Sequence, residues 1–143
     1  MLDLSDQRQS RMDARLRQET GAYFTTVRPD GRPHTVPVWF AWDGASILIF
    51  SKPDDIKVRN LRQNPAVTLA LDNFGARSQP VVVEGTAALV EEAAIAALLS
   101  AYTAKYAALA AALATQLGLP PEALARIYTQ PIRITPSRIR QDL

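Results

Sequence analysis

The chain has no cysteine and a single histidine, and these two shortages exclude several kinds of site. Without cysteine there are no disulfides and no thiolate metal sites. One histidine, His34, with scattered carboxylates supplies too few ligands for a metal centre. No nucleophile motif accompanies it, so a Ser-His-Asp hydrolase has no support either. We therefore predict no metal ligands, and we expect His34, beside a turn, to be exposed and idle.

An excess of charge of one sign is also missing. The 16 Lys and Arg residues against 14 Asp and Glu give a net charge of +2, which is too small to indicate a nucleic-acid partner. One short segment is basic, but no aromatic residues interleave with its cations to stack on bases. Its members are Lys52, Lys57, Arg59 and Arg62.

Long uninterrupted hydrophobic runs are absent as well. The longest apolar stretch, residues 93–117, contains Ser100, Lys105 and other polar residues, so we predict no membrane span. The N-terminal residues are charged and lack the apolar core of a secretory signal. Together these features predict a cytoplasmic protein with neither a nucleic-acid nor a membrane partner.

What the chain does contain is the composition and patterning of one domain over residues 1–143. No repeat or linker divides it. Five or six strands in hairpin order predict an antiparallel barrel of the α+β class with peripheral helices. Strands are expected at 22–27, 34–41, 45–51, 66–72, 81–89 and 132–139, and helices from Ser5 or Asp6 to Glu19, from Asp54 or Asp55 to Gln63, from Glu91 to Gly118 and from Pro120 to Tyr128.

Three residue types predict local detail within these strands. Pro33 and Pro37 lack an N–H, which favours an edge strand over a central one. Gly85 is expected at a bulge or a close backbone approach. Trp39 and Trp42, three positions apart, are expected on opposite faces if one strand carries both.

The stretch from Val36 to Leu61 says most about function. Its first part, residues 36–51, reads as a β-hairpin closed by Asp43-Gly44. The second strand leads into a short helix with a hydroxyl and several cations, a combination that phosphate binding requires. Those residues are Ser51, Lys52, Lys57 and Arg59. The alternative is a solvated helix face with surface ion pairs to Asp54 and Asp55, in which Lys57 contributes little to stability.

The same residues resemble a known family. The pattern is a Pro-Asp-Gly turn, Pro37-Val-Trp-Phe40, Trp42-Asp-Gly44 and then Ser51-x-Pro53-x3-Lys57-x3-Leu61-x2-Asn64-Pro65-x-Val67. It resembles the split-barrel flavin-binding proteins, also described as pyridoxamine-phosphate-oxidase-like. Within them it is most similar to the branch that uses the deazaflavin coenzyme F420. The resemblance covers residues 22–89, and the ending 132–138 also fits.

This resemblance implies a split β-barrel that forms a homodimer, with each cofactor in a groove between two barrels. It implies an oxidoreductase that passes hydride from reduced coenzyme F420 to a small reducible molecule. An FMN-binding oxidoreductase of the same fold and a non-catalytic carrier of flavin or another planar ligand stay open. Vitamin B6 oxidation is disfavoured, because Gln141-Asp-Leu143 offers no Arg- and His-bearing substrate segment.

The resemblance also implies a cofactor-binding set, whereas no catalytic residue is named because a flavin-type cofactor carries the hydride itself. The backbone of one strand is expected at the ring edge of the cofactor, at Thr35, Val36, Pro37, Val38 and Trp39. Ser51 and Lys52 are expected beside the ribityl-phosphate part, Lys57 on the phosphate with Arg59 close by, and Gln79 at the same cofactor from the other subunit.

Overall fold

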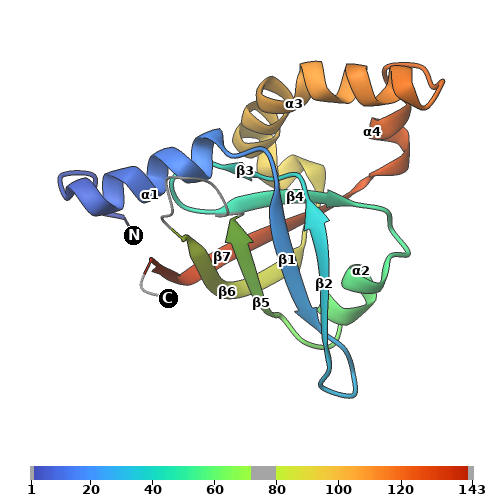
Figure 1. Cartoon of the computed structure of the whole chain (residues 1–143). Helices are drawn as coiled ribbons and strands as arrows, with labels where there is room; N and C mark the ends of the chain where they lie inside the picture. The colour runs from blue at the N-terminus through green and yellow to red at the C-terminus, as the bar shows by residue number, and fades with distance from the viewer. Residues whose placement is uncertain (1, 72–79, 142–143) are drawn as a thin grey trace.

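Seven β-strands form one antiparallel sheet in the computed structural model, which describes residues 2–71 and 80–141 (Figure 1). The strand order is β2-β1-β5-β6-β7-β4-β3. The strands are β1 (Ala22–Val27), β2 (Pro33–Val38), β3 (Ala41–Trp42), β4 (Ile47–Ser51), β5 (Ala66–Leu71), β6 (Val82–Leu89) and β7 (Gln130–Arg140). The helices are α1 (Gln7–Gln18), α2 (Ile56–Leu61), a 3-10 turn η1 (Glu92–Ile95), α3 (Ala96–Gln116) and α4 (Ala123–Ile127). The predicted α+β class with a mainly antiparallel sheet is confirmed.

The core is built from side chains that alternate inward along the strands. Burial of each large aliphatic or aromatic side chain contributes about 1.5–3 kcal/mol. Helix α1 adds Met12 and Leu16 to this cluster, and α2 adds Val58 and Leu61. Asp6 caps α1 by accepting hydrogen bonds from two backbone N–H groups of the first turn. Fully buried strand members are Phe24, Ile47, Ile49, Leu69, Val83, Ile132 and Ile134.

The predicted hairpin over residues 36–51 is wrong for most of its length. Strand β2 pairs with β1, and only Ala41 and Trp42 pair with β4. The chain leaves the ladder at Trp39 and Phe40, where the buried Phe40 N–H donates to the Tyr106 hydroxyl at 2.9 Å. Strand β2 consequently ends at one edge of the sheet and β3 begins at the other. The placement of Pro33 and Pro37 in an edge strand is confirmed.

Gly85 lies at a register shift between β6 and β7, as the sequence predicts. A Cβ on Gly85 would come within 2.3 Å of the Thr135 carbonyl oxygen and 2.9 Å of the Pro136 Cα. Both atoms belong to the backbone, so they cannot move aside as a flexible side chain would. The absence of a side chain therefore allows the two strands to cross this closely.

Helix α3 leaves the barrel and is followed by α4, which turns back toward it (Figure 1). The predicted start at Glu91 is a 3-10 turn rather than α-helix. Only Leu98, Tyr106 and Ala114 are buried along α3. Among the described residues, Glu92–Gln116 is the one helical stretch long and apolar enough to cross a membrane, a test that a core helix or a signal sequence also passes. The prediction that it is no membrane span stays a prediction.

Candidate functional site

The candidate site begins where α2 packs on β1 and β6, next to the strand β2 that pairs with β1. The buried Asn60 side-chain amide donates to the Thr26 hydroxyl at 2.9 Å. Thr26 and His34 are direct partners across β1 and β2, so their side chains lie on the same face. Arg28 follows β1 directly, and its charge acts on His34. Helix α2 thus lies beside residues that carry a hydroxyl, an imidazole and a guanidinium.

Lys57, the predicted phosphate ligand, is a buried residue of α2, and its charge acts on His34. Its side chain is 11% exposed and its Nζ binds the Asp55 carboxylate at 2.9 Å. The buried Ser51 hydroxyl is directed at the Lys52 carbonyl oxygen, at 2.9 Å, and at the same carboxylate, at 3.3 Å. Asp55 stands at the N-cap position of α2 but makes no capping hydrogen bond. Its carboxylate instead gathers Ser51 and Lys57, which the sequence pattern had placed in one site.

Arg28 and His34 extend this cluster and were missed as site residues. The Arg28 Nε and the His34 Nδ1 are buried and have no hydrogen-bond partner among the described residues. His34 is half-buried, so the expectation that it is exposed is wrong. The signal available in the sequence was the Pro29-Asp30-Gly31 turn, which reverses the chain so that Arg28 and His34 lie near the adjoining ends of β1 and β2. Buried polar atoms without a partner are rare in folded proteins and point to a missing ligand or solvent group.

The surroundings of His34 and of Asp55 lower the pKa of both side chains. A lower pKa favours the neutral imidazole of His34 and the ionised carboxylate of Asp55. Burial lowers the pKa of His34, the Arg28 and Lys57 cations lower it further, and Asp55 opposes them. Burial alone raises the pKa of Asp55. The hydrogen bond and charge of Lys57, the Ser51 hydroxyl and the Lys52 charge outweigh it, so the pKa lies below its ordinary value. The cluster of Arg28, Lys57 and Asp55 therefore keeps one positive charge in excess.

The other two predicted cations are exposed, whereas Lys57 is buried. Arg59 is exposed on another face of α2 and lines a surface cavity of about 500 Å³ together with Arg28 and Arg32. Lys52 is exposed, and its Nζ lies 5.8 Å from the centre of the Tyr128 ring. Arg28 and Asn60 line this cavity and also belong to the site at α2.

The predicted ring-edge residues lie on β2 and just beyond it. Thr35 and Pro37 are exposed, and the Thr35 hydroxyl shares a hydrogen bond of 2.8 Å with Thr25. Val36 and Val38 are half-buried on the opposite face. Trp39 lies past the end of the strand. Gln79, the predicted contribution from a second subunit, lies outside the described residues.

Trp39 belongs to an aromatic cluster that joins the barrel to α3. Its ring stacks on Tyr106 with a centroid distance of 4.7 Å and an interplanar angle of 1°. Tyr102 contacts Tyr106 and packs edge-on against Phe50. Trp42 lies apart from this cluster in the core, where its indole N–H donates to Asp13 at 2.8 Å. The break after β2 therefore sends the two tryptophans to different environments.

Lys105 adds a cation to the aromatic cluster. Its Nζ donates to the Phe40 carbonyl at 2.9 Å and lies 4.0 Å from the centre of the Phe40 ring. Burial lowers the pKa of Lys105 to about 8, with Glu19 acting in the other direction. Lys105 thus binds the middle of α3 to the barrel at Phe40.

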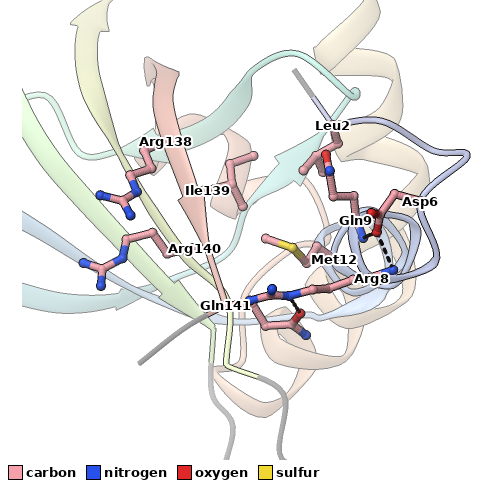
Figure 2. Close-up of a pocket in the computed structure, with 9 residues that line it drawn as sticks. All are labelled: Leu2, Asp6, Arg8, Gln9, Met12, Arg138, Ile139, Arg140 and Gln141. Atoms are coloured by element: carbon pink, nitrogen blue, oxygen red, sulfur yellow. Dashed lines mark hydrogen bonds between the residues drawn. The ribbon is translucent and has the colours of Figure 1, made fainter.

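A second surface cavity, of about 440 Å³, lies between α1 and the end of β7 (Figure 2). In Figure 2 the side chain of Arg8 reaches toward Gln141, and its Nε donates to the Gln141 side-chain oxygen at 2.8 Å. None of the predicted site residues lines it. Within residues 2–71 and 80–141, no group of three or more acidic or histidine side chains is arranged to hold a metal. The α2 cluster is therefore the candidate functional site.

The family follows from the sequence match over residues 9–141 to the family described as pyridoxamine 5'-phosphate oxidase. The chain belongs to this family. The match spans all seven strands of the sheet and confirms the split-barrel fold. No protein of curated function matches the sequence.

Solved structures with the same fold have differing names. An F420 reductase is 24% identical, with coverage of 91% of this chain and 96% of that one and a TM-score of 0.68. A putative pyridoxamine 5'-phosphate oxidase from Listeria innocua is 20% identical, with coverage of 94% and 97% and a TM-score of 0.66. The heme storage protein HutZ from Vibrio cholerae is 14% identical, with coverage of 92% of each chain and a TM-score of 0.69. At these identities the likeness establishes the fold.

Proposed function

We propose that this family member is a homodimeric oxidoreductase that takes hydride from reduced coenzyme F420 and delivers it to a small reducible molecule. The observation that carries the proposal is the buried cationic cluster at α2, at the position where the family resemblance predicts a cofactor phosphate. The likeness in fold to an F420 reductase over nearly the whole of both chains supports the choice of coenzyme.

The residues present fit a phosphate-bearing cofactor. A phosphate group needs positive charge and hydrogen-bond donors that have no other acceptor. Lys57 and Arg28 provide the charge, and the Arg28 Nε is a buried donor with no acceptor among the described residues. One carboxylate, Asp55, neutralises one of the two cations and leaves the excess that an anion would match.

In this proposal the chain binds and orients the coenzyme, and the coenzyme supplies the hydride chemistry. Lys57, Ser51 and Lys52 hold the phosphate end, and Arg59 contributes charge from the neighbouring cavity. Strand β2 is an edge strand, so the row of backbone groups that faces away from β1 is available to the ring edge from Thr35 to Trp39. Gln79 of the second subunit remains part of the proposed site.

The homodimer is proposed on the surface of α3. The exposed positions of α3 carry no charged residue, because the helix has Lys105 as its single ionisable cation and that side chain packs on Phe40. Large apolar side chains are also exposed nearby, and a second copy would cover them. They are Leu109, Leu117, Leu119, Ile127 and Tyr128. Sedimentation should give a dimer with or without cofactor, whereas a monomer that still binds cofactor would contradict this.

Two alternatives differ from the proposal in cofactor or in turnover. FMN carries a phosphate as well, so the same cluster would hold it. A carrier without turnover is favoured by one observation, the shared fold with a heme storage protein. A cytoplasmic location and a small-molecule substrate are part of the leading proposal.

The test is a titration of the purified protein with coenzyme F420, FMN and heme, followed by turnover assays with a panel of reducible compounds. We expect coenzyme F420 to bind most tightly and its reduced form to be oxidised. Lys57→Ala should weaken cofactor binding about tenfold to a hundredfold, because it removes a charge-assisted hydrogen bond of about 1.5–3 kcal/mol. The exposed Arg32→Ala, outside the proposed binding set, is the control for loss of a nearby charge.

Tight binding of FMN with no response to coenzyme F420 would overturn the choice of coenzyme. Binding of any of the three without turnover would favour the carrier. Affinity for the cofactor within twofold of wild type in Lys57→Ala would remove Lys57 from the site.

A further inference from the structure

The α2 cluster contains more than a lysine poised for phosphate. The His34 Nδ1 and the Arg28 Nε are both buried without a hydrogen-bond partner among the described residues. The charges of Arg28 and Lys57 both act on His34. The Lys57 amine is not free in this structure, since Asp55 binds it at 2.9 Å. An incoming anion therefore meets two unsatisfied nitrogens and one amine that already has a counter-anion.

We propose that Arg28, His34 and Lys57 form one pocket for a phosphate group, in which Asp55 is the counter-anion of the ligand-free protein and His34 takes up a proton as the phosphate binds. The inference rests on the proposed function only in taking the ligand to be a phosphate-bearing cofactor. It adds a proton to the binding step and assigns two residues that the family pattern does not.

Proton uptake follows from the charges that act on His34. Arg28 comes from the end of β1, Lys57 from α2, and Asp55 from the segment before α2. In the ligand-free protein burial and the two cations lower the pKa of the imidazole, and Asp55 offsets them only in part. A phosphate in the same pocket adds negative charge beside the ring and accepts a hydrogen bond from it, and both effects favour the imidazolium.

Asp55 competes with the ligand for Lys57. The carboxylate and a phosphate would both be acceptors for one ammonium group, and two anions placed together repel each other. Binding therefore requires the Asp55 carboxylate to release Lys57 in part. Its side chain is 34% exposed, so it can turn toward solvent at little cost.

The experiment uses the single histidine of the chain as a probe. The ring proton signal of His34 is followed by NMR against pH in chloride, in inorganic phosphate at equal ionic strength, and in saturating FMN. We expect the titration midpoint in phosphate and in FMN to lie about one unit or more above that in chloride. In parallel, calorimetric binding heats should vary with the ionisation enthalpy of the buffer, and His34→Gln should remove the part of that variation that comes from proton uptake by the imidazole, leaving the part that comes from the phosphate itself.

Three variants separate the pocket from a general charge effect. Lys57→Gln should raise the midpoint in chloride and abolish the response to phosphate. Asp55→Asn should lower the midpoint in chloride and tighten phosphate binding several-fold. Arg32→Gln, which removes an exposed guanidinium paired with Asp30, should behave as wild type.

A His34 midpoint that is the same in chloride, phosphate and FMN overturns the proposal. A shift that persists in Lys57→Gln overturns the shared pocket. The outcome is independent of turnover: an active enzyme with an unmoved His34 refutes the pocket alone, whereas a shifted His34 without turnover refutes the oxidoreductase alone.

Discussion

Replacing Lys57 by alanine should destabilise the folded protein. The sequence predicts a small effect instead, because there Lys57 reads as a surface lysine. Lys57 is 9% exposed, so alanine removes buried methylene groups worth about 0.8 kcal/mol each. It also leaves the Asp55 carboxylate without its cation. Loss of one partner costs about 3–5 kcal/mol in a fully buried pair and about 0–1 kcal/mol in an exposed one.

The pair lies between these limits, since the side chains are 11% and 34% exposed. We take about 1 kcal/mol for the lost cation and up to about 2 kcal/mol for the stem, which gives about 2–3 kcal/mol in all. Urea unfolding measures this directly, provided that the slope with denaturant is unchanged. Lys57→Met keeps the stem and should lose only about 1 kcal/mol.

The pH dependence of the free energy of unfolding supplies an independent check. The folded-state pKa of Asp55 lies below its ordinary value, so the stability it contributes is present above about pH 4 and is lost as the pH falls through the folded pKa. In Lys57→Ala this acid-side loss should shrink, because the hydrogen bond and charge that depress the pKa are gone. A free energy of unfolding within about 0.5 kcal/mol of wild type would refute the reasoning, as would an effect equal to that of the exposed Arg59→Ala.

Three further changes test other parts of the structure by their free energy of unfolding. Gly85→Ala should cost about 2–3 kcal/mol, because its Cβ would meet backbone atoms of β7 at 2.3 and 2.9 Å; no loss would place the strand crossing elsewhere. Tyr106→Phe should cost about 2 kcal/mol, because it orphans the Phe40 N–H and the Thr20 carbonyl, while Tyr102→Phe should cost little; equal effects would contradict the hydrogen-bond account. His34→Gln should lose less stability than wild type between about pH 7 and about pH 5. The folded-state pKa of His34 is lowered, so the wild type is destabilised as the pH falls below the pKa of the unfolded histidine, whereas glutamine does not titrate. Parallel profiles of unfolding free energy against pH would contradict this.

Local features of the fold were predictable because each depends on a few neighbouring residues. Pro33 and Pro37 predicted the edge strand through their missing N–H, and Asp6 predicted the start of α1 through its carboxylate. Gly85 predicted the bulge. The pairing of residues 36–51 was not predictable in this way, because the hydroxyl that takes the Phe40 N–H out of the ladder belongs to Tyr106, 66 residues further along the chain.

The candidate site was predictable in part for the same reason. Ser51 and Lys57 are close in sequence, and the structure brings them together on Asp55. Arg59 follows Lys57 by two residues, which on a helix turns its side chain to a different face. Arg28 and His34 lie on either side of the turn between β1 and β2, far from Lys57 in the sequence. Only the folded structure shows that the charges of Arg28 and Lys57 both act on His34.

The arrangement of charge at α2 is itself an argument for a ligand. Burying the Arg28 Nε and the His34 Nδ1 without partners costs stability, and so does placing two cations around one imidazole. Apolar residues at the same positions would join the adjacent core formed by Val58 and Leu61 at no such cost. The charges of Arg28 and Lys57 both act on His34, and the single carboxylate of Asp55 offsets only one of them. In the proposed site the group that would accept a hydrogen bond from the Arg28 Nε and match the remaining positive charge is an anion.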